Sequence, residues 1–251
     1  MELLDAIILG IVQGITEWLP ISSSGHLVIF QELFGMNVPV FFDIMLHFAT
    51  LLVILLVFWK DIWKVIYSWL TWKKDEYWKL GWFVLLGSVF TACLGLLFKD
   101  YILTFFSNLK IVGIALICTG LFLYLTKFVD GYKKLKWYDS ILIGVMQGIA
   151  LVPGVSRSGS TIGTGLLLGI DREKVAKFSF ILVIPAIIGA TILEYDSSFV
   201  VGNLLVVLGG MLVSIVVGYI SLKLLMRVIM NNKFWIFSFY CVALGILLLF
   251  L

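Results

Sequence analysis

The sequence predicts an all-α integral membrane protein with six transmembrane helices plus two broken re-entrant helical hairpins in an inverted-topology repeat. Composition gives the first reason, because 62% of the residues are hydrophobic and 13% are charged, with a mean hydropathy of +1.12. Such values are typical of multi-span helical membrane proteins. No tract is polar enough to form a separate soluble domain, so residues 1–251 are expected to form a single membrane domain.

Six apolar runs are long enough to cross a bilayer as helices. They cover residues 41–59, 80–98, 111–126, 178–193, 204–226 and 234–251. Two further apolar stretches are interrupted, residues 3–34 by the string PISSSGH and residues 138–169 by VPGVSRSGST. Each is expected to fold as a helix, a polar break and a second short helix. Non-helical backbone at membrane depth is tolerated only inside protein or beside a watery cavity, so the breaks predict an interior site.

The two interrupted stretches resemble each other at a constant spacing of 134 residues. The string ILGIVQGI (residues 8–15) resembles LIGVMQGI (residues 142–149). In the breaks that follow, Ser22, Ser24 and Gly25 match Ser156, Ser158 and Gly159. The chain is therefore expected to consist of two repeat halves, about 1–126 and 138–251, with a site where the two copies meet.

Basic residues predict the orientation. Segments 60–79, 127–136, 172–177 and 223–233 hold 5, 4, 3 and 3 Lys or Arg, which is 15 of the 18 in the chain. By the positive-inside rule these segments face the cytoplasm, which places both termini on the extracytoplasmic side of the plasma membrane. The first hairpin would then enter from outside and the second from the cytoplasm. Orientation of the spans also explains the net charge of +3, so no nucleic-acid partner is expected.

The first break carries a carboxylate and a histidine. Gln13 and Glu17 are four residues apart, on one helical face just before Pro20. Glu17 is a candidate metal ligand, general base or hydrogen-bond acceptor, or else an interfacial residue. His26 is a candidate nucleophile or proton donor, and Ser23 a phosphate ligand or nucleophile. The alternative for this serine-rich string, which includes Ser22 and Ser24, is a helix cap.

The second break is suited to binding an anion. Ser156, Ser158 and Thr161 lie at the start of the helix that follows Pro153 and Gly154, and backbone amides at a helix N-terminus attract phosphate. Arg157 can pair with phosphate oxygens through both of its terminal nitrogens, which makes it the candidate clamp for a diphosphate. The alternatives are an arginine that extends to the membrane interface or one that bridges a carboxylate such as Glu17.

Asp43 and His47 are also four residues apart, at the start of the first full span. They are expected either to orient the site residues through hydrogen bonds, without contacting the substrate, or to mark the membrane interface.

With these motifs the chain resembles the undecaprenyl-diphosphate phosphatase family, the membrane enzymes linked to bacitracin resistance, over nearly its whole length. The family's acidic motif, Glu or Gln followed four residues later by Glu, corresponds to Gln13 and Glu17, and LPISSSGHL and PGVSRSGST follow as expected. Many members carry a glutamate in place of Gln13, and an amide is a weaker ligand for a hard cation.

The resemblance implies hydrolysis of undecaprenyl diphosphate to the monophosphate and inorganic phosphate, which recycles the carrier lipid for cell-envelope polymers. It implies a divalent cation, Mg²⁺ or Ca²⁺, with Glu17 as its protein ligand. The catalytic residues would be Glu17, Ser23, His26 and Arg157. The substrate-binding residues would be Gln13, Ser22, Ser24, Ser156, Ser158 and Thr161.

The expected partners are an isoprenoid lipid diphosphate and membrane lipids, and a homodimer is allowed. The rival function is a lipid transporter or flippase, because inverted repeats with broken helices are also found in transporters. The two activities are not exclusive.

Overall fold

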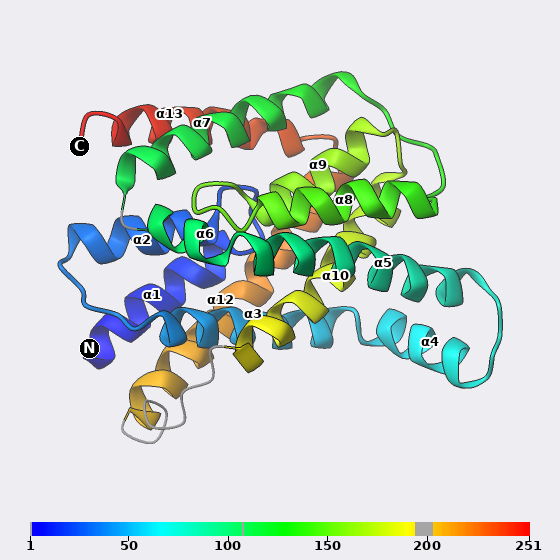
Figure 1. Ribbon diagram of the computed structural model, residues 1–251, viewed down its shortest axis with the longest axis horizontal. Coiled ribbons are helices and arrows are strands. Elements are labelled where there is room, and N and C mark those ends of the chain that lie inside the picture. Colours follow the sequence, from blue (N-terminus) through cyan, green and yellow to red (C-terminus); the bar gives the residue numbers. More distant parts are fainter. Residues whose placement is uncertain (1, 107, 194–202) are drawn as a thin grey trace.

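The computed structural model describes residues 2–106, 108–193 and 203–251, and Figure 1 shows them as a bundle of helices. Within those ranges the only β contact is an isolated parallel bridge between Lys133 and Ile170. The α-helices are α1 (Leu3–Thr16), α2 (Ser23–Leu33), α3 (Val40–Val57), α4 (Trp59–Leu70), α5 (Glu76–Leu97), α6 (Lys99–Phe105), α7 (Leu109–Leu125), α8 (Trp137–Ile149), α9 (Arg157–Leu167), α10 (Arg172–Leu193), α12 (Leu204–Met230) and α13 (Phe237–Leu248). The predicted all-α class is confirmed.

Five helices are long and apolar enough to cross a membrane, which confirms a multi-pass membrane protein. They are Val40–Val57, Glu76–Leu97, Leu109–Phe128, Arg172–Leu193 and Leu204–Met230. The sixth predicted run, 234–251, forms a shorter apolar helix, Phe234–Leu248, whose first turn is a 3₁₀ helix. At about 1.5 Å per residue this helix is shorter than a hydrocarbon core of about 30 Å.

Both interrupted stretches fold as two helices separated by a short break. The break between α1 and α2 spans residues 17–22, and the break between α8 and α9 spans residues 150–156. Each second helix begins at a capping serine: Ser22 Oγ accepts a hydrogen bond from the Gly25 amide, and Ser156 Oγ accepts one from the Gly159 amide. Both breaks contain a residue with a positive φ, Ser22 at 69° and Gly154 at 95°. The positive-φ residue thus lies at the capping serine in the first break and two residues before the capping serine in the second.

The two breaks contact each other directly. The Gly154 amide donates to Ser22 Oγ at 3.0 Å, and Ser158 Oγ donates to the Leu19 carbonyl at 3.3 Å. Residues about 135 positions apart in the sequence therefore form one buried loop cluster.

Glycines bring the helices that carry the breaks close to their neighbours. Helix α1 packs on α12, and α8 packs on α5. A Cβ atom at Gly10 would lie 2.5 Å from the Gly210 carbonyl oxygen, and one at Gly144 would lie 2.2 Å from that of Gly87. Close backbone approach at small residues is a common way for helices to pack in membranes. Because Gly10 and Gly144 are equivalent in the repeat, the two hairpins are held by the same kind of contact.

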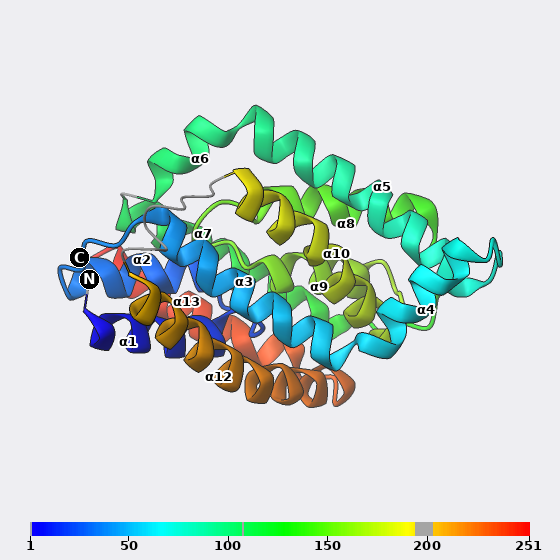
Figure 2. The same ribbon diagram turned by 90° about the horizontal axis from the view of Figure 1, so that it is seen from below.

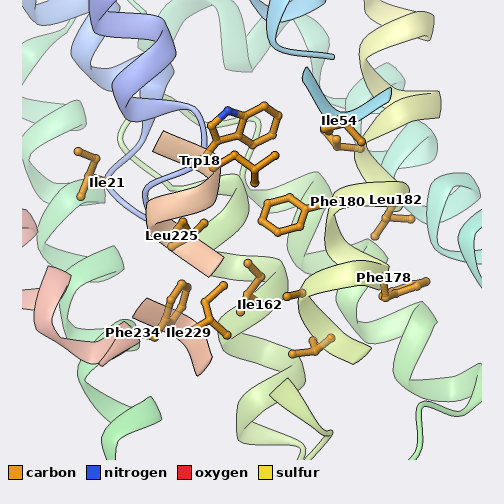
Figure 3. Packing of buried hydrophobic residues seen from close by; sticks show 14 of the residues in the cluster. Trp18, Ile21, Ile54, Ile162, Phe178, Phe180, Leu182, Leu225, Ile229 and Phe234 are labelled. Atoms are coloured by element: carbon orange, nitrogen blue, oxygen red, sulfur yellow. The ribbon is translucent and has the colours of Figure 1, made fainter. Parts of the chain in front are cut away.

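Aromatic packing joins the first break to the main core, as Figure 3 shows for Trp18 and Phe180. The Trp18 ring meets Phe180 of α10 edge to face, with ring centres 5.8 Å apart. Phe58 stacks on the Phe180 ring as well, with ring centres 5.4 Å apart. The break is thus anchored by buried apolar surface and not only by hydrogen bonds.

Both termini lie at one end of the bundle, whereas the connections between α4 and α5 and between α7 and α8 lie at the other end (Figures 1 and 2). These two connections carry most of the basic residues of segments 60–79 and 127–136. The predicted segregation of basic connections from the termini is seen for these two segments. Helix α4 lies largely within segment 60–79, which was predicted to be a connection between spans.

Substituting Gly144 with Ala is expected to destabilise the protein by about 1–3 kcal/mol, because the added methyl group would overlap the backbone of α5. Gly189→Ala in α10 is the matched control, since nothing lies within 4 Å of its added Cβ. Thermal unfolding in detergent should give a lower Tm for Gly144→Ala and an unchanged or higher Tm for the control. Equal Tm values would contradict the close contact.

Candidate active site

The carboxylate of Glu17 is the centre of the candidate site. Glu17 follows α1 directly, and its side chain is 4% exposed. Its Oε1 atom accepts a hydrogen bond of 2.5 Å from Arg157 Nη2. Its Oε2 atom accepts hydrogen bonds from Ser23 Oγ at 2.7 Å and from Gln13 Nε2 at 3.0 Å. The structure thus brings together four of the predicted site residues, drawn from both hairpins.

The repeat explains why a hydroxyl and a guanidinium meet at this carboxylate. Ser23 is the first residue of α2 and Arg157 is the first residue of α9, each directly after a capping serine. The two residues are 134 positions apart, so they occupy equivalent sites in the two hairpins. Because the breaks pack against each other, the two helix starts face the same buried carboxylate.

Arg157 is placed to bind an anion in addition to Glu17. The guanidinium carbon lies 5.7 Å from the centre of the Trp18 ring, which packs one face of the group. Among the described residues, Arg157 Nη1 is buried without a hydrogen-bond partner. A buried donor without a partner costs about 1–3 kcal/mol, and more when it is charged. An oxyanion that accepted a hydrogen bond from this nitrogen would remove that cost.

Gln13 has a buried acceptor atom without a partner among the described residues, whereas Arg157 has such a donor. Its amide nitrogen is bound to Glu17, but its Oε1 atom is buried and has no hydrogen-bond partner in the described part of the chain. An amide oxygen is a suitable ligand for a hard cation. In the same ranges there is no cluster of three or more His, Cys, Asp or Glu residues that could hold a metal by themselves. A cation at this site would therefore need oxygen ligands from a bound substrate as well.

The predicted phosphate-binding hydroxyls are all at the breaks, and each already has a partner. Ser22 and Ser156 cap their helices, as the alternative interpretation of the serine-rich string allowed. Ser24 Oγ lies 3.4 Å from Ser22 Oγ, and Ser158 Oγ lies 3.3 Å from Ser156 Oγ. Thr161 donates to the Arg157 carbonyl and lies 2.5 Å from Ser179 Oγ. Their role as phosphate ligands stays a prediction.

His26 is the one predicted catalytic residue that lies apart from the Glu17 cluster. Its Nδ1 atom is 2.8 Å from the Ser22 carbonyl oxygen, and its Nε2 atom is 2.7 Å from the Tyr240 hydroxyl. A carbonyl can only accept, so Nδ1 donates, and Nε2 of the neutral ring accepts from Tyr240. The His26 hydrogen bonds in the structure go to these two partners and none goes to Glu17, Ser23 or Arg157. Tyr240 was missed because it lies within an apolar run of α13, where nothing distinguishes it.

His47 of α3 approaches Glu17 at Oε2, whereas Arg157 contacts the other carboxylate oxygen, Oε1. Its Nε2 atom lies 3.4 Å from Glu17 Oε2, within range of an ion pair when the imidazole is protonated. Its Nδ1 atom lies 2.8 Å from the Asp43 carbonyl oxygen. The Asp43 carboxylate accepts two hydrogen bonds from Gln31 of α2, at 2.9 and 3.0 Å. Of the two expectations for Asp43 and His47, the structure supports proximity to the site. Gln31 was not predicted.

An apolar cavity of about 530 Å³ lies beside the second break. It is lined by Leu94, Phe98, Tyr101, Ile102, Phe105, Gly148, Ile149 and Val152. The lining comes from α5, α6 and α8, and Val152 belongs to the same break that leads into Arg157. The described chain therefore has an apolar space lined by a residue, Val152, that is close in sequence to Arg157.

The sequence matches a family model described as bacitracin resistance protein BacA over residues 6–247. A relative from Halothermothrix orenii named undecaprenyl-diphosphatase is 39% identical over 260 residues, covering 100% of this chain and 98% of the relative. A relative of the same name from Desulfosudis oleivorans is 43% identical and covers 98% and 97%, respectively. One from Korarchaeum cryptofilum is 40% identical and covers 99% of both chains. The protein, whose motifs lie inside the matched region, therefore belongs to the BacA family of bacitracin resistance proteins.

Proposed function

We propose that the protein hydrolyses undecaprenyl diphosphate to undecaprenyl phosphate and inorganic phosphate, and so recycles the carrier lipid for cell-envelope synthesis. The full-length similarity to relatives named undecaprenyl-diphosphatase supports the substrate. The observation that carries the chemistry is the contact between Ser23 Oγ and Glu17 Oε2 at 2.7 Å, with Arg157 on the other carboxylate oxygen. A hydroxyl, a base and a cationic clamp are the groups that phosphoryl transfer requires.

Ser23 is the nucleophile in this proposal. Its oxygen attacks the terminal phosphorus while Glu17 takes the hydroxyl proton, and the bond from phosphorus to the bridging oxygen breaks. Undecaprenyl phosphate leaves with that oxygen and takes the proton from Glu17, and a phosphoserine remains. A water molecule then gives a proton to the Glu17 carboxylate and attacks the same phosphorus. The bond from phosphorus to the Ser23 oxygen breaks, Glu17 returns the proton to that oxygen, and inorganic phosphate is released. His26 is a less suitable nucleophile, since both of its ring nitrogens are occupied by Ser22 and Tyr240.

Arg157 holds the diphosphate. Its unpartnered Nη1 atom would donate to a phosphate oxygen, and Nη2 would turn from Glu17 to a second oxygen. Fixed donors of this kind stabilise the charge that develops on the transferred group. The predicted serine and threonine ligands would complete the phosphate contacts once their present hydrogen bonds rearrange.

The site residues fit a divalent cation that is shared with the substrate. Glu17 contributes a carboxylate and Gln13 an unpartnered amide oxygen, so Mg²⁺ or Ca²⁺ would be held by these two groups together with diphosphate oxygens. When bound, the cation would neutralise charge on the diphosphate. The isoprenoid tail would use the apolar cavity beside the second break, which is lined by residues of α5, α6, α8 and the break.

The topology belongs to the proposal as well. Six spans, with α13 as the sixth, and two re-entrant hairpins form an inverted repeat with both termini outside the cytoplasm. Support comes from the equal spacing of the hairpins, the matched packing of α1 on α12 and of α8 on α5, and the basic connections at the end opposite to the termini (Figure 1). The site where the two breaks meet is expected to open to the outer face.

The second candidate is transport of the lipid, which the paired broken helices favour. A transporter without chemistry would move the lipid phosphate across a bilayer but would release no inorganic phosphate from the purified protein in detergent. Release of phosphate by the purified protein would therefore support the phosphatase.

Arg157→Ala is expected to lower phosphate release about 100- to 1000-fold, because the substitution removes the donors that hold the transferred group. Arg172→Ala is the matched control, since Arg172 pairs with the exposed Asp130 away from the site. Phosphate release from undecaprenyl diphosphate should stay within about twofold of wild type in this control. Full activity in Arg157→Ala would exclude the clamp.

Ser23→Ala is expected to abolish turnover and covalent labelling. Acid-quenched wild-type enzyme should carry ³²P from terminally labelled substrate as an acid-stable phosphoserine, whereas a phosphohistidine would be lost in acid. Ser88→Ala is the control, because Ser88 Oγ only donates to the Val84 carbonyl within α5. If the acid-stable label persists in the Ser23 variant, a residue other than Ser23 is the nucleophile.

EDTA is expected to stop phosphate release, and added Mg²⁺ or Ca²⁺ should restore it. Gln13→Glu should reduce the cation concentration needed for half-maximal activity, because it puts a carboxylate where the amide oxygen now lies. Gln13→Leu should increase that concentration. If both variants need the same cation concentration as wild type, Gln13 is not a ligand.

A further inference from the structure

The partners of Glu17 are distributed unevenly over its two oxygens. Oε1 has one close partner, Arg157, whereas Oε2 is approached by Ser23, Gln13 and His47. In the proposed function Arg157 turns toward the diphosphate, which would leave Oε1 free. Ser23 also moves, because it attacks phosphorus. The orientation of the carboxylate during the reaction would then depend on Gln13 and His47.

His47 belongs to α3 and not to either hairpin. Its Nδ1 atom lies 2.8 Å from the Asp43 carbonyl oxygen, one helical turn earlier. The Asp43 carboxylate is in turn tied to α2, the second helix of the first hairpin, by the two hydrogen bonds from Gln31. The imidazole therefore reaches Glu17 from a long spanning helix outside the two breaks. The His47 side chain is 27% exposed, so a change there removes little buried packing.

The two repeat halves show whether His47 belongs to the site or to the scaffold, because a scaffold residue would be expected in both halves. Gly35 and Gly169 follow the second helix of each hairpin at the same spacing of 134, with φ of 60° and 78°, so the register continues up to the next helix. At that spacing the counterpart of Glu17 is Leu151 and that of His47 is Ile181.

The anchoring residues differ between the halves in the same way. The counterpart of Gln31 is Gly165, and the counterpart of Asp43 is Lys177, which pairs with Asp61 at 3.0 Å. The half with the carboxylate thus has the imidazole and its anchor, and the half without the carboxylate lacks all three. An interfacial histidine unrelated to Glu17 would leave this joint difference unexplained.

We propose that His47 is a positioning residue, which keeps Glu17 Oε2 on the Ser23 hydroxyl after Arg157 has turned to the substrate. The inference rests on the proposed function and extends it from the groups that contact substrate to one that acts through Glu17. Second partners that fix a functional group commonly change activity by about 10- to 100-fold when they are removed.

The test compares three substitutions of His47 by phosphate release from undecaprenyl diphosphate, with kcat and KM measured separately and Tm recorded for each variant. His47→Leu removes the polar contact. His47→Gln places an amide donor at about the reach of the imidazole, and His47→Asn carries the same amide one methylene shorter. We expect kcat to fall about 10- to 100-fold in the Leu and Asn variants with KM within about twofold, and to return to within about threefold of wild type in the Gln variant.

Equal kcat losses in the Gln and Asn variants would overturn the proposal, as would an unchanged kcat in the Leu variant or a loss confined to KM. If the Leu variant does not fold, the Gln and Asn pair alone decides. A higher cation requirement in the Leu or Asn variant would make His47 a metal ligand and would also overturn the positioning role. Wild-type protein that released no phosphate would instead remove the proposed function itself, and so the two failures are distinguishable.

Discussion

The ion pair between Glu17 and Arg157 constrains the rest of the structure. Both side chains are largely buried, and breaking a buried pair by removing one partner costs about 3–5 kcal/mol. The two groups lie on different hairpins, 140 residues apart, so the breaks must occupy the same place in the bundle. That requires α1 and α8 to approach their neighbours very closely, which the glycine contacts with α12 and α5 permit. The glycines of the scaffold and the charged pair of the site therefore serve the same end, which is to bring the two breaks together.

The same pair prepares the site for an anionic substrate. The Arg157 charge is compensated by Glu17, and yet one guanidinium nitrogen has no partner among the residues that the structure describes. In the proposed function, a diphosphate would gain that donor and would compete with Glu17 for the other. If Arg157 turned to the substrate, the carboxylate would lose its closest partner and would become a better proton acceptor for the Ser23 hydroxyl. The proposal thus couples substrate binding to activation of Ser23 through a single side chain.

Much of this could be predicted from the sequence, for identifiable reasons. Apolar length predicted five of the spans, and Pro, Gly and serine strings predicted both breaks. The meeting of Glu17, Ser23 and Arg157 followed from the repeat, because equivalent breaks of two copies tend to lie together. The Tyr240 contact with His26 joins residues 214 positions apart and leaves no local pattern. Helix α4 was missed because its lysines resemble those of a connection. Helix α13 was predicted within the run 234–251 but is shorter than that run, because it ends at Leu248.

Chemistry also explains why the halves of a repeat with such regular spacing differ at the site. Two identical copies would place the same residue type at both equivalent positions. Two carboxylates in place of Glu17 and Leu151 would add a second buried negative charge, and arginine at both Ser23 and Arg157 would remove the hydroxyl that Glu17 now accepts from. In this site the first copy supplies the acid, Glu17, and the second supplies the base, Arg157, so the buried pair is neutral overall. The capping serines and glycines that both halves share, such as Ser22 with Ser156 and Gly10 with Gly144, build the framework. Glu17 and Arg157, which carry the charge of the site, each have an uncharged counterpart, Leu151 and Ser23.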